Sequence, residues 1–162
     1  MKTLIILRHA KSDWSDSSLN DFDRPLNKRG KKDAPIMGNY LSENNAIPDI
    51  IISSPAMRAK LTVSNICETI GYDNEIIWNN DFYPGDVETI LDYIPEIPDK
   101  YNSAMIVGHN PVMEELVCLL SKEDITFPTC ATAVFDIDIS SWKGFCDKKT
   151  RLRLFTVPKE IK

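Results

Sequence analysis

The sequence predicts a three-layer α/β/α fold with a mostly parallel central sheet and an edge strand or hairpin near the C-terminus. Short runs of Leu, Ile and Val recur along the chain, and stretches with the 3.6-residue hydrophobic period of an amphipathic helix separate them. The length of 162 residues, 43% of them hydrophobic, suits one domain over residues 1–162 and is enough for a buried core.

Six segments are expected to be strands, the last two as a hairpin or edge pair: 2–7, 49–52, 75–78, 104–107, 133–139 and 151–157. Four segments are expected to be helices: 31–44, 56–70, 86–94 and 111–120. Pro35 is compatible with the first helix only in its first turn, where no N–H is needed. Gly71 stands where a helix commonly ends, and residues 12–27, rich in Ser, Asp and Asn, are expected to form a loop.

The charge and the apolar pattern exclude several classes of protein. A net charge of −5 argues against nucleic acid or an anionic membrane as the main partner, so a phosphate site has to be a local cluster of positive groups. The N-terminal apolar run is too short for a signal peptide or a membrane span, which indicates a cytoplasmic protein with reduced cysteines. No Cys or His pair has metal-ligand spacing, and neither common nucleotide-binding motif occurs, so no metal and no cofactor are expected.

Cationic and imidazole side chains follow three of the predicted strands. Arg8 and His9 directly follow the first strand, Arg58 comes shortly after the second, and His109 follows the fourth. Ligands of open α/β sheets bind beyond the carboxyl ends of the strands, so these residues are expected to share one crevice. Two arginines and two imidazoles form an anion site suited to a phosphoryl group. The backbone N–H groups of the turn at residues 53–55 are expected to point at the same anion.

Each of these signals has a purely structural alternative. A histidine after a strand is commonly just a polar residue leaving the core, and an arginine in the first turn of a helix commonly forms a surface ion pair. Their joint occurrence at three strand ends, with both histidines of the chain, favours a site.

Four motifs occur in order along the chain: RHAKSDW, DRPLNKRG, SSPAMRAKLT and VGHNP. With them the chain resembles the histidine phosphatase superfamily, which has the phosphoglycerate-mutase-like fold, and within it the small phosphohistidine phosphatases. The resemblance implies that His9 is the nucleophile and His109 the second histidine of the site. It also implies that Arg8 and Arg58 bind the phosphoryl group, together with Arg24 of the RPL segment. Alanine follows the RH pair here, where many relatives have glycine.

The chemistry that the resemblance implies needs no metal. A neutral nitrogen of His9 attacks phosphorus, the arginines stabilise the charge on the oxygens, and water then cleaves the phosphohistidine intermediate. The proton donor is the least defined group: motif position favours Asp21, and Asp23, Asp86 and Glu88 are the other candidates. An imidazole leaving group, with a pKa of about 6.5, departs without such an acid, whereas an alcohol needs one.

The expected function is therefore a metal-independent phosphatase that acts on phosphohistidine in proteins. No acid-bearing insertion separates Arg58 from His109, which favours this substrate over a small-molecule phosphoester. The alternatives are a phosphomonoesterase or mutase of the same superfamily, and a phosphate-binding module without turnover, which would need the arginines but not the nucleophile. Asp13 and Trp14 are expected to be structural parts of their loop, and Thr129 and Thr132 are further candidates for the pocket wall.

Overall fold

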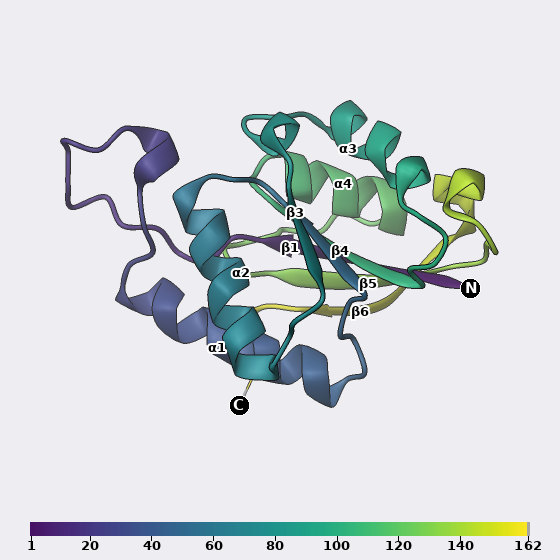
Figure 1. The fold of residues 1–162 in the computed structure, drawn as a ribbon, viewed down its shortest axis with the longest axis horizontal. Helices are drawn as coiled ribbons and strands as arrows, with labels where there is room; N and C mark the ends of the chain where they lie inside the picture. Colours follow the sequence, from purple (N-terminus) through teal and green to yellow (C-terminus); the bar gives the residue numbers. More distant parts are fainter. Residues whose placement is uncertain (162) are drawn as a thin grey trace.

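A computed structural model describes residues 1–161. It contains a six-stranded mixed sheet in the order β3-β2-β4-β1-β5-β6, with helices on both faces (Figure 1). The strands β3, β2, β4 and β1 pair in parallel, whereas β5 pairs antiparallel with both β1 and β6. Their bounds are Lys2–Arg8 (β1), Ile50–Ser53 (β2), Glu75–Trp78 (β3), Ser103–Gly108 (β4), Thr132–Ile137 (β5) and Thr150–Thr156 (β6). The predicted mostly parallel sheet with a C-terminal edge pair is confirmed.

Two helices cover each face of the sheet: α1 (Lys28–Glu43) and α2 (Met57–Ile70) on one side, α3 (Val87–Tyr93) and α4 (Val112–Ser121) on the other. The alternation of β1 produces both cores, because successive side chains of a strand point to opposite faces. Ile5 and Leu7 are buried in the core beneath α1 and α2, whereas Leu4 and Ile6 belong to the core beneath α3 and α4. This is the predicted three-layer architecture.

Helix α1 differs from its prediction. It begins three residues earlier, because the side chain of Asn27 accepts a hydrogen bond from the Gly30 N–H and caps it there. Pro35 therefore lies inside the helix, and the expectation that it sits in the first turn is wrong. Packing overrides the missing N–H, since the following residues Met37 and Leu41 are fully buried against the sheet.

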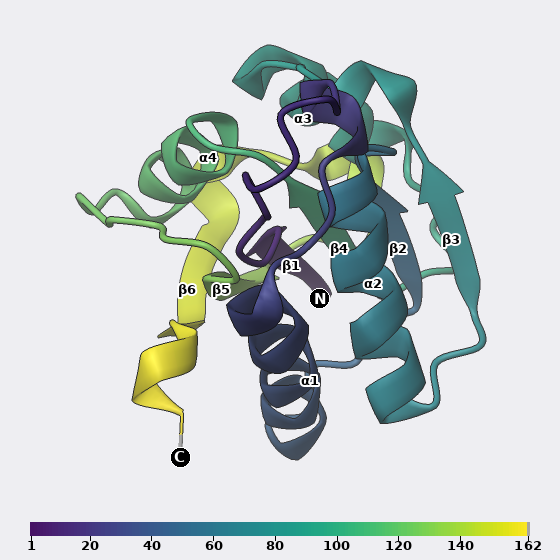
Figure 2. The ribbon, with the colours of Figure 1, turned by 90° about the vertical axis from the view of Figure 1, so that its left-hand side faces the viewer.

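The other predictions hold with small shifts of the bounds. Gly71 follows α2 with a φ of 66°, as its predicted role at a helix end requires. The predicted loop 12–27 contains one short 3₁₀ turn, Asp21–Asp23, which lies beside the start of α2 (Figure 2). The four cysteines are free, and within residues 1–161 no helix is long and apolar enough to cross a membrane.

Candidate active site

The predicted crevice forms where β1, β2 and β4 end side by side. Arg8 pairs with Gly108 at the ends of the parallel strands β1 and β4, so the two residues that follow, His9 and His109, lie with ring centroids 5.0 Å apart. A cavity of about 340 Å³ opens there. It is lined by all six residues expected in the site, together with others: Arg8, His9, Asp21, Arg24, Arg58 and His109. We call it the phosphoryl cavity.

His9 is held as a neutral imidazole with one unprotonated nitrogen. Its Nδ1 lies 2.7 Å from the carbonyl oxygen of Ala10, which can only accept, so Nδ1 carries the proton and Nε2 has a free lone pair. Burial, supported by the neighbouring side chains of His109, Arg58 and Arg8, lowers the pKa of His9 from 6.5 to about 3, although the hydrogen bond to the Ala10 carbonyl acts in the opposite direction. The ring therefore carries no charge at neutral pH, with one protonated nitrogen and one free lone pair.

The backbone around His9 is equally fixed. The His9 N–H donates to the Gly108 carbonyl (3.1 Å), and the His9 carbonyl accepts from the N–H of Cys130 (3.0 Å). The next N–H, that of Ala10, donates to the hydroxyl of Thr62 in α2 (2.9 Å). His9 and the residue after it are thus anchored by three separate parts of the fold.

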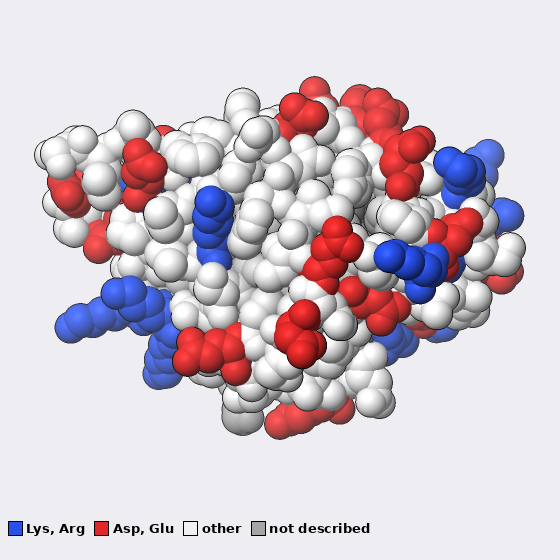
Figure 3. Space-filling view, in the orientation of Figure 1, with Lys and Arg blue, Asp and Glu red and all other residues white. Residues whose placement is uncertain are grey.

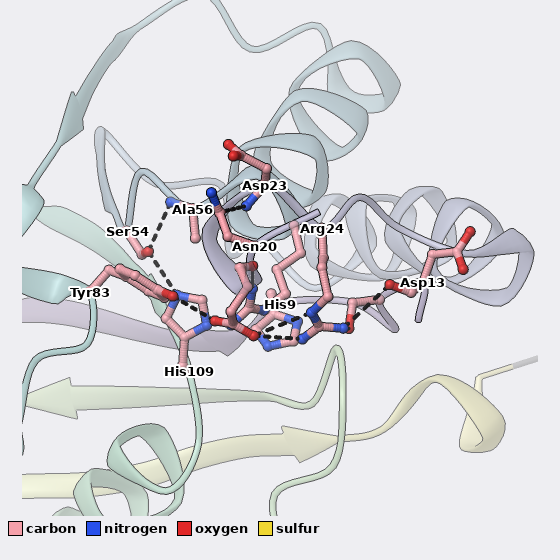
Figure 4. Close-up of polar contacts among 12 residues, drawn as sticks. His9, Asp13, Asn20, Asp23, Arg24, Ser54, Ala56, Tyr83 and His109 are labelled. Atoms are coloured by element: carbon pink, nitrogen blue, oxygen red, sulfur yellow. Dashed lines mark hydrogen bonds and ion pairs between the residues drawn. The ribbon is translucent and has the colours of Figure 1, made fainter. Parts of the chain in front are cut away.

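Ser54 determines which nitrogen of His109 carries a proton. The Ser54 Oγ lies 2.7 Å from His109 Nε2 and accepts a hydrogen bond from the Ala56 N–H (Figure 4). Because Ser54 is fully buried, its own proton needs an acceptor, and Nε2 is the acceptor in contact. We therefore assign the proton of His109 to Nδ1. Burial, and then the charge of Arg58, lower the pKa of His109 to about 4, so this ring is neutral as well.

The expectation that the backbone N–H groups of the turn at residues 53–55 point at a bound anion is wrong. The N–H of Ser54 donates to the carbonyl of Val107, and the N–H of Ala56 donates to Ser54 Oγ, so these groups are used within the protein. The turn contributes to the site through the hydroxyl of Ser54 instead.

Unpaired donors mark the phosphoryl cavity as an anion site. Among residues 1–161, three buried side-chain polar atoms have no hydrogen-bond partner: Arg8 Nε, Arg58 Nε and His109 Nδ1. Leaving a buried donor unpaired costs about 1–3 kcal/mol. All three belong to residues that line this cavity, so a bound oxyanion would remove the penalty.

Asp21 occupies the region between the two other arginines as an anion. Its Oδ1 accepts from Arg24 Nη2 (3.1 Å), and its Oδ2 accepts from Arg58 Nη2 (3.0 Å) and from the Tyr83 hydroxyl (2.6 Å). The hydrogen bond from Tyr83, and then the two arginines, lower the pKa of Asp21 to about 2. In the free site this carboxylate is therefore ionised and holds no proton to donate.

The other acid candidates lie farther out. A second cavity adjoins the phosphoryl cavity, and Asp86 is among the residues that line it. Asp23 and Glu88 line neither of the two cavities. The Asp86 carboxylate accepts from the N–H and the hydroxyl of Thr89, which lower its pKa. In the described part of the chain, no group of three or more His, Cys, Asp or Glu is arranged to hold a metal ion.

Tyr83 is a site residue that the sequence did not reveal. It lies in the turn after β3, and its ring contacts that of His109 edge-on, with centroids 5.4 Å apart. Its hydroxyl donates a hydrogen bond to the Asp21 carboxylate (2.6 Å). The surrounding stretch DFYPGD has the composition of a turn and no periodicity, so no pattern in the sequence distinguished this tyrosine.

Trp14 and the threonines also have defined places. Trp14 is 70% exposed and lies against Arg24, with the guanidinium carbon 3.3 Å from the ring centroid, so this loop residue forms part of the cavity wall. Thr129 lines the phosphoryl cavity, whereas Thr132 is fully buried in β5 and does not.

Comparison with known proteins identifies relatives over nearly the whole chain. Residues 4–81 match the histidine phosphatase superfamily (branch 1). An uncharacterized chloroplastic protein of Arabidopsis thaliana is 34% identical over 154 residues, which cover 88% of this chain and 69% of the relative. The crystal structure of SixA from Agrobacterium tumefaciens, a candidate phosphohistidine phosphatase, superimposes with a TM-score of 0.83 at 30% identity, covering 97% of this chain and 99% of that one. The protein histidine phosphatase SixA complexed with tungstate shares the fold, with a TM-score of 0.83 at 20% identity and 99% coverage of both chains.

Proposed function

Because the chain belongs to the histidine phosphatase superfamily and is a histidine-type phosphatase, we propose that His9 is its nucleophile and that it dephosphorylates phosphohistidine in proteins. One observation carries the choice of substrate: the free site holds neither a protonated carboxyl group nor a protonated, cationic histidine that could act as a general acid. Asp21 is ionised, and both histidines are neutral. Such a site suits a leaving group that departs without protonation.

In the first step the phosphoryl group takes the place of the Asp21 carboxylate. Its oxygens accept from the unpaired nitrogens of Arg8, Arg58 and His109, and from Arg24 once Asp21 gives way. His9 Nε2 attacks phosphorus and a new N–P bond forms. The bond to the substrate nitrogen breaks with its electron pair going to the departing imidazole, which leaves neutral because its other ring nitrogen carries a proton. The arginines hold the charge that develops on the equatorial oxygens.

In the second step water attacks the phosphoryl group on His9. A P–O bond forms as the N–P bond breaks, the electron pair returns to Nε2, and the two protons of the water stay on the inorganic phosphate that is released. The hydrogen bond from Nδ1–H to the Ala10 carbonyl stays in place through both steps, so the ring keeps its tautomer and orientation.

The leaving group separates the proposed substrate from a small-molecule phosphoester. An alkoxide needs a proton as it departs, and general-acid catalysis contributes about 10²–10⁴-fold to such reactions. An imidazole has a pKa of about 6.5 and needs no acid near neutral pH. A site whose nearest carboxylate is ionised therefore favours P–N cleavage over hydrolysis of alkyl esters.

A protein substrate fits the surface next to the cavity. Trp14 and Phe22 are 70% and 38% exposed, and both belong to the 12–27 loop that bounds the site. Exposed aromatic side chains at the mouth of a site are typical of surfaces that contact another protein. We propose phosphorylated proteins as partners on this basis.

The test uses a phosphohistidine peptide, an alkyl phosphate and an aryl phosphate. Wild-type protein should hydrolyse the peptide and the aryl ester, with a much lower kcat/KM for the alkyl ester. H9A should lose turnover of all three and the acid-labile, alkali-stable phosphoryl label that wild-type protein shows when quenched. A folded H9A protein that keeps its rate would disprove the nucleophile, and a wild-type preference for the alkyl ester would disprove the substrate.

A further inference from the structure

A second, larger cavity adjoins the phosphoryl cavity. Its volume is about 490 Å³, and it shares with the phosphoryl cavity four lining residues: Asp21, Arg58, His109 and Asn110. A phosphoryl group bound between Arg58 and His9 therefore has open space on the side of His109, where the rest of the substrate can lie.

The walls of this second cavity suit a flat group. Tyr83 stands edge-on to the His109 ring, and Pro84, Pro111 and Val112 complete the apolar part of the lining. Planar rings pack well against aromatic and proline surfaces, and an imidazole or a phenyl ring is of a suitable size.

The two cavities differ in charge. The phosphoryl cavity is lined by four basic side chains, Arg8, Lys11, Arg24 and Arg58, and one acidic one. The second cavity contains Arg58 as its one basic residue, with three carboxylates: Asp21, Asp86 and Glu115.

The same asymmetry extends over the surface. In Figure 3, acidic side chains gather over α3 and basic ones over the start of α1. The Asp86 carboxylate caps α3 and is held in place by Thr89, and Glu115 belongs to α4.

We propose that the second cavity is a leaving-group subsite in which Asp86 and Glu115 select cationic substrates. This inference rests on the proposed function and names the substrate more closely. The enzyme takes phosphohistidine in a basic sequence context and discriminates against phosphoesters whose leaving group carries a carboxylate or a second phosphate. The phosphoryl cavity has to be positive to bind any phosphoryl group, so it cannot favour substrates with a cationic leaving group. That preference has to come from the carboxylates of the second cavity.

The test compares two aryl phosphates of similar shape, 4-(trimethylammonio)phenyl phosphate and 4-carboxyphenyl phosphate. The quantity measured is the ratio of their kcat/KM values in wild-type protein, D86N, E115Q and the double variant. Dividing each variant's ratio by that of the wild type cancels the intrinsic reactivity of the two esters. D92N is the matched control, because Asp92 is an exposed residue of α3 that does not line the cavity.

A carboxylate about 6 Å from a unit charge on the substrate changes the binding of that substrate about threefold. The cationic and the anionic ester respond in opposite directions, so the ratio of their kcat/KM values should shift by about tenfold for each carboxylate removed. D86N and E115Q should each lower the preference for the cationic ester by this factor, D92N should not, and 1 M NaCl should weaken the wild-type preference. A phosphohistidine peptide flanked by Lys should likewise be preferred over one flanked by Glu in wild-type protein and in D92N, and this preference should be lost in the double variant.

The outcomes separate the two proposals. An unchanged ratio in the double variant, with normal His9-dependent hydrolysis, would overturn the subsite and leave the phosphatase mechanism intact. Loss of preference in D92N as large as in D86N would also overturn it, because the effect would then be general surface charge. No hydrolysis of either ester by wild-type protein would overturn the proposed function together with the subsite.

Discussion

Replacing Asp21 by Asn distinguishes two roles of this carboxylate: a competitor of the phosphoryl group for the arginines, or a general acid. In the structure, Asp21 pairs with Arg24 and Arg58 and accepts from Tyr83, and these contacts lower its pKa to about 2. Asn has nearly the same shape and no charge. A phosphoryl group entering D21N therefore displaces a neutral side chain rather than a carboxylate, and we expect oxyanions to bind more tightly than in the wild type.

The magnitude follows from the exposure of the ion pairs. The Asp21 side chain is 49% exposed, so each pair contributes about 0.2–1 kcal/mol, the range for pairs in contact with water. Two pairs give about 0.4–2 kcal/mol, which corresponds to about 2- to 30-fold tighter binding at 1.4 kcal/mol per tenfold change.

The assay measures competitive inhibition by inorganic phosphate and by tungstate against an aryl phosphate, and kcat/KM for an alkyl phosphate and a phosphohistidine peptide. The inhibition constants should fall in D21N, and the ratio of the two substrates should stay as in wild type. D23N is the control, because Asp23 carries the same charge in the same loop and lies outside the cavity.

Two results would refute this reasoning. A loss of about 10²–10⁴ on the alkyl ester alone would mean that Asp21 takes up a proton in the complex and acts as the general acid after all. Weaker binding of phosphate would mean that Asp21 orients the arginines more than it competes for them.

Three further predictions concern backbone packing, pH and metals. A Cβ on Gly30 would lie 2.2 Å from the backbone oxygen of Lys11, so G30A should lower the free energy of unfolding in urea by about 1–3 kcal/mol. G38A in the same helix is the control and should not, because its Cβ would have its nearest contact at 3.4 Å. Equal stability of the two variants would contradict the packing argument. Burial lowers the folded-state pKa of His9 to about 3 and of His109 to about 4, so the unfolded chain binds more protons below pH 6.5, and stability should fall as the pH drops from 6.5 towards 4. Each histidine contributes up to about 1.4 kcal/mol per pH unit, and H109N should remove one such contribution from the slope; an unchanged slope would show that His109 is not held neutral. Hydrolysis should persist in EDTA because arginines supply the charge that holds the phosphoryl oxygens, and a rate lost in EDTA and restored by Mg²⁺ or Zn²⁺ would overturn that expectation.

The fold was predictable because its signals are local. Runs such as the one from Leu4 to Leu7 have few alternatives to a buried strand, and Gly71 ends α2 for a reason contained in one residue. Pro35 was misplaced because the capping side chain of Asn27 and the burial of the helix outweigh one lost hydrogen bond. The sequence shows the local cost at Pro35 but not the packing that compensates it.

The site was predictable only in part. Residues that directly follow a strand, such as His9 and His109, can be placed together once the sheet is assumed parallel. The state of Asp21 depends on Arg58, 37 residues away in the chain, and on Tyr83, 62 residues away. No spacing rule relates such positions, so the sequence identified the carboxylate and missed both its ionisation and the tyrosine that holds it.

The backbone hydrogen bonds of His9 tie this residue to the centre of the sheet. Its N–H and its carbonyl are engaged by Gly108 at the end of β4 and by Cys130 just before β5, on either side of the central strand β1. Local opening at a loop cannot free this residue, so its amide proton should exchange with deuterium only when the whole domain unfolds. The position of the His9 ring then depends on the global stability of the fold. Substitutions that weaken a distant part of the core should lower the fraction of active molecules while leaving the turnover of each folded molecule unchanged.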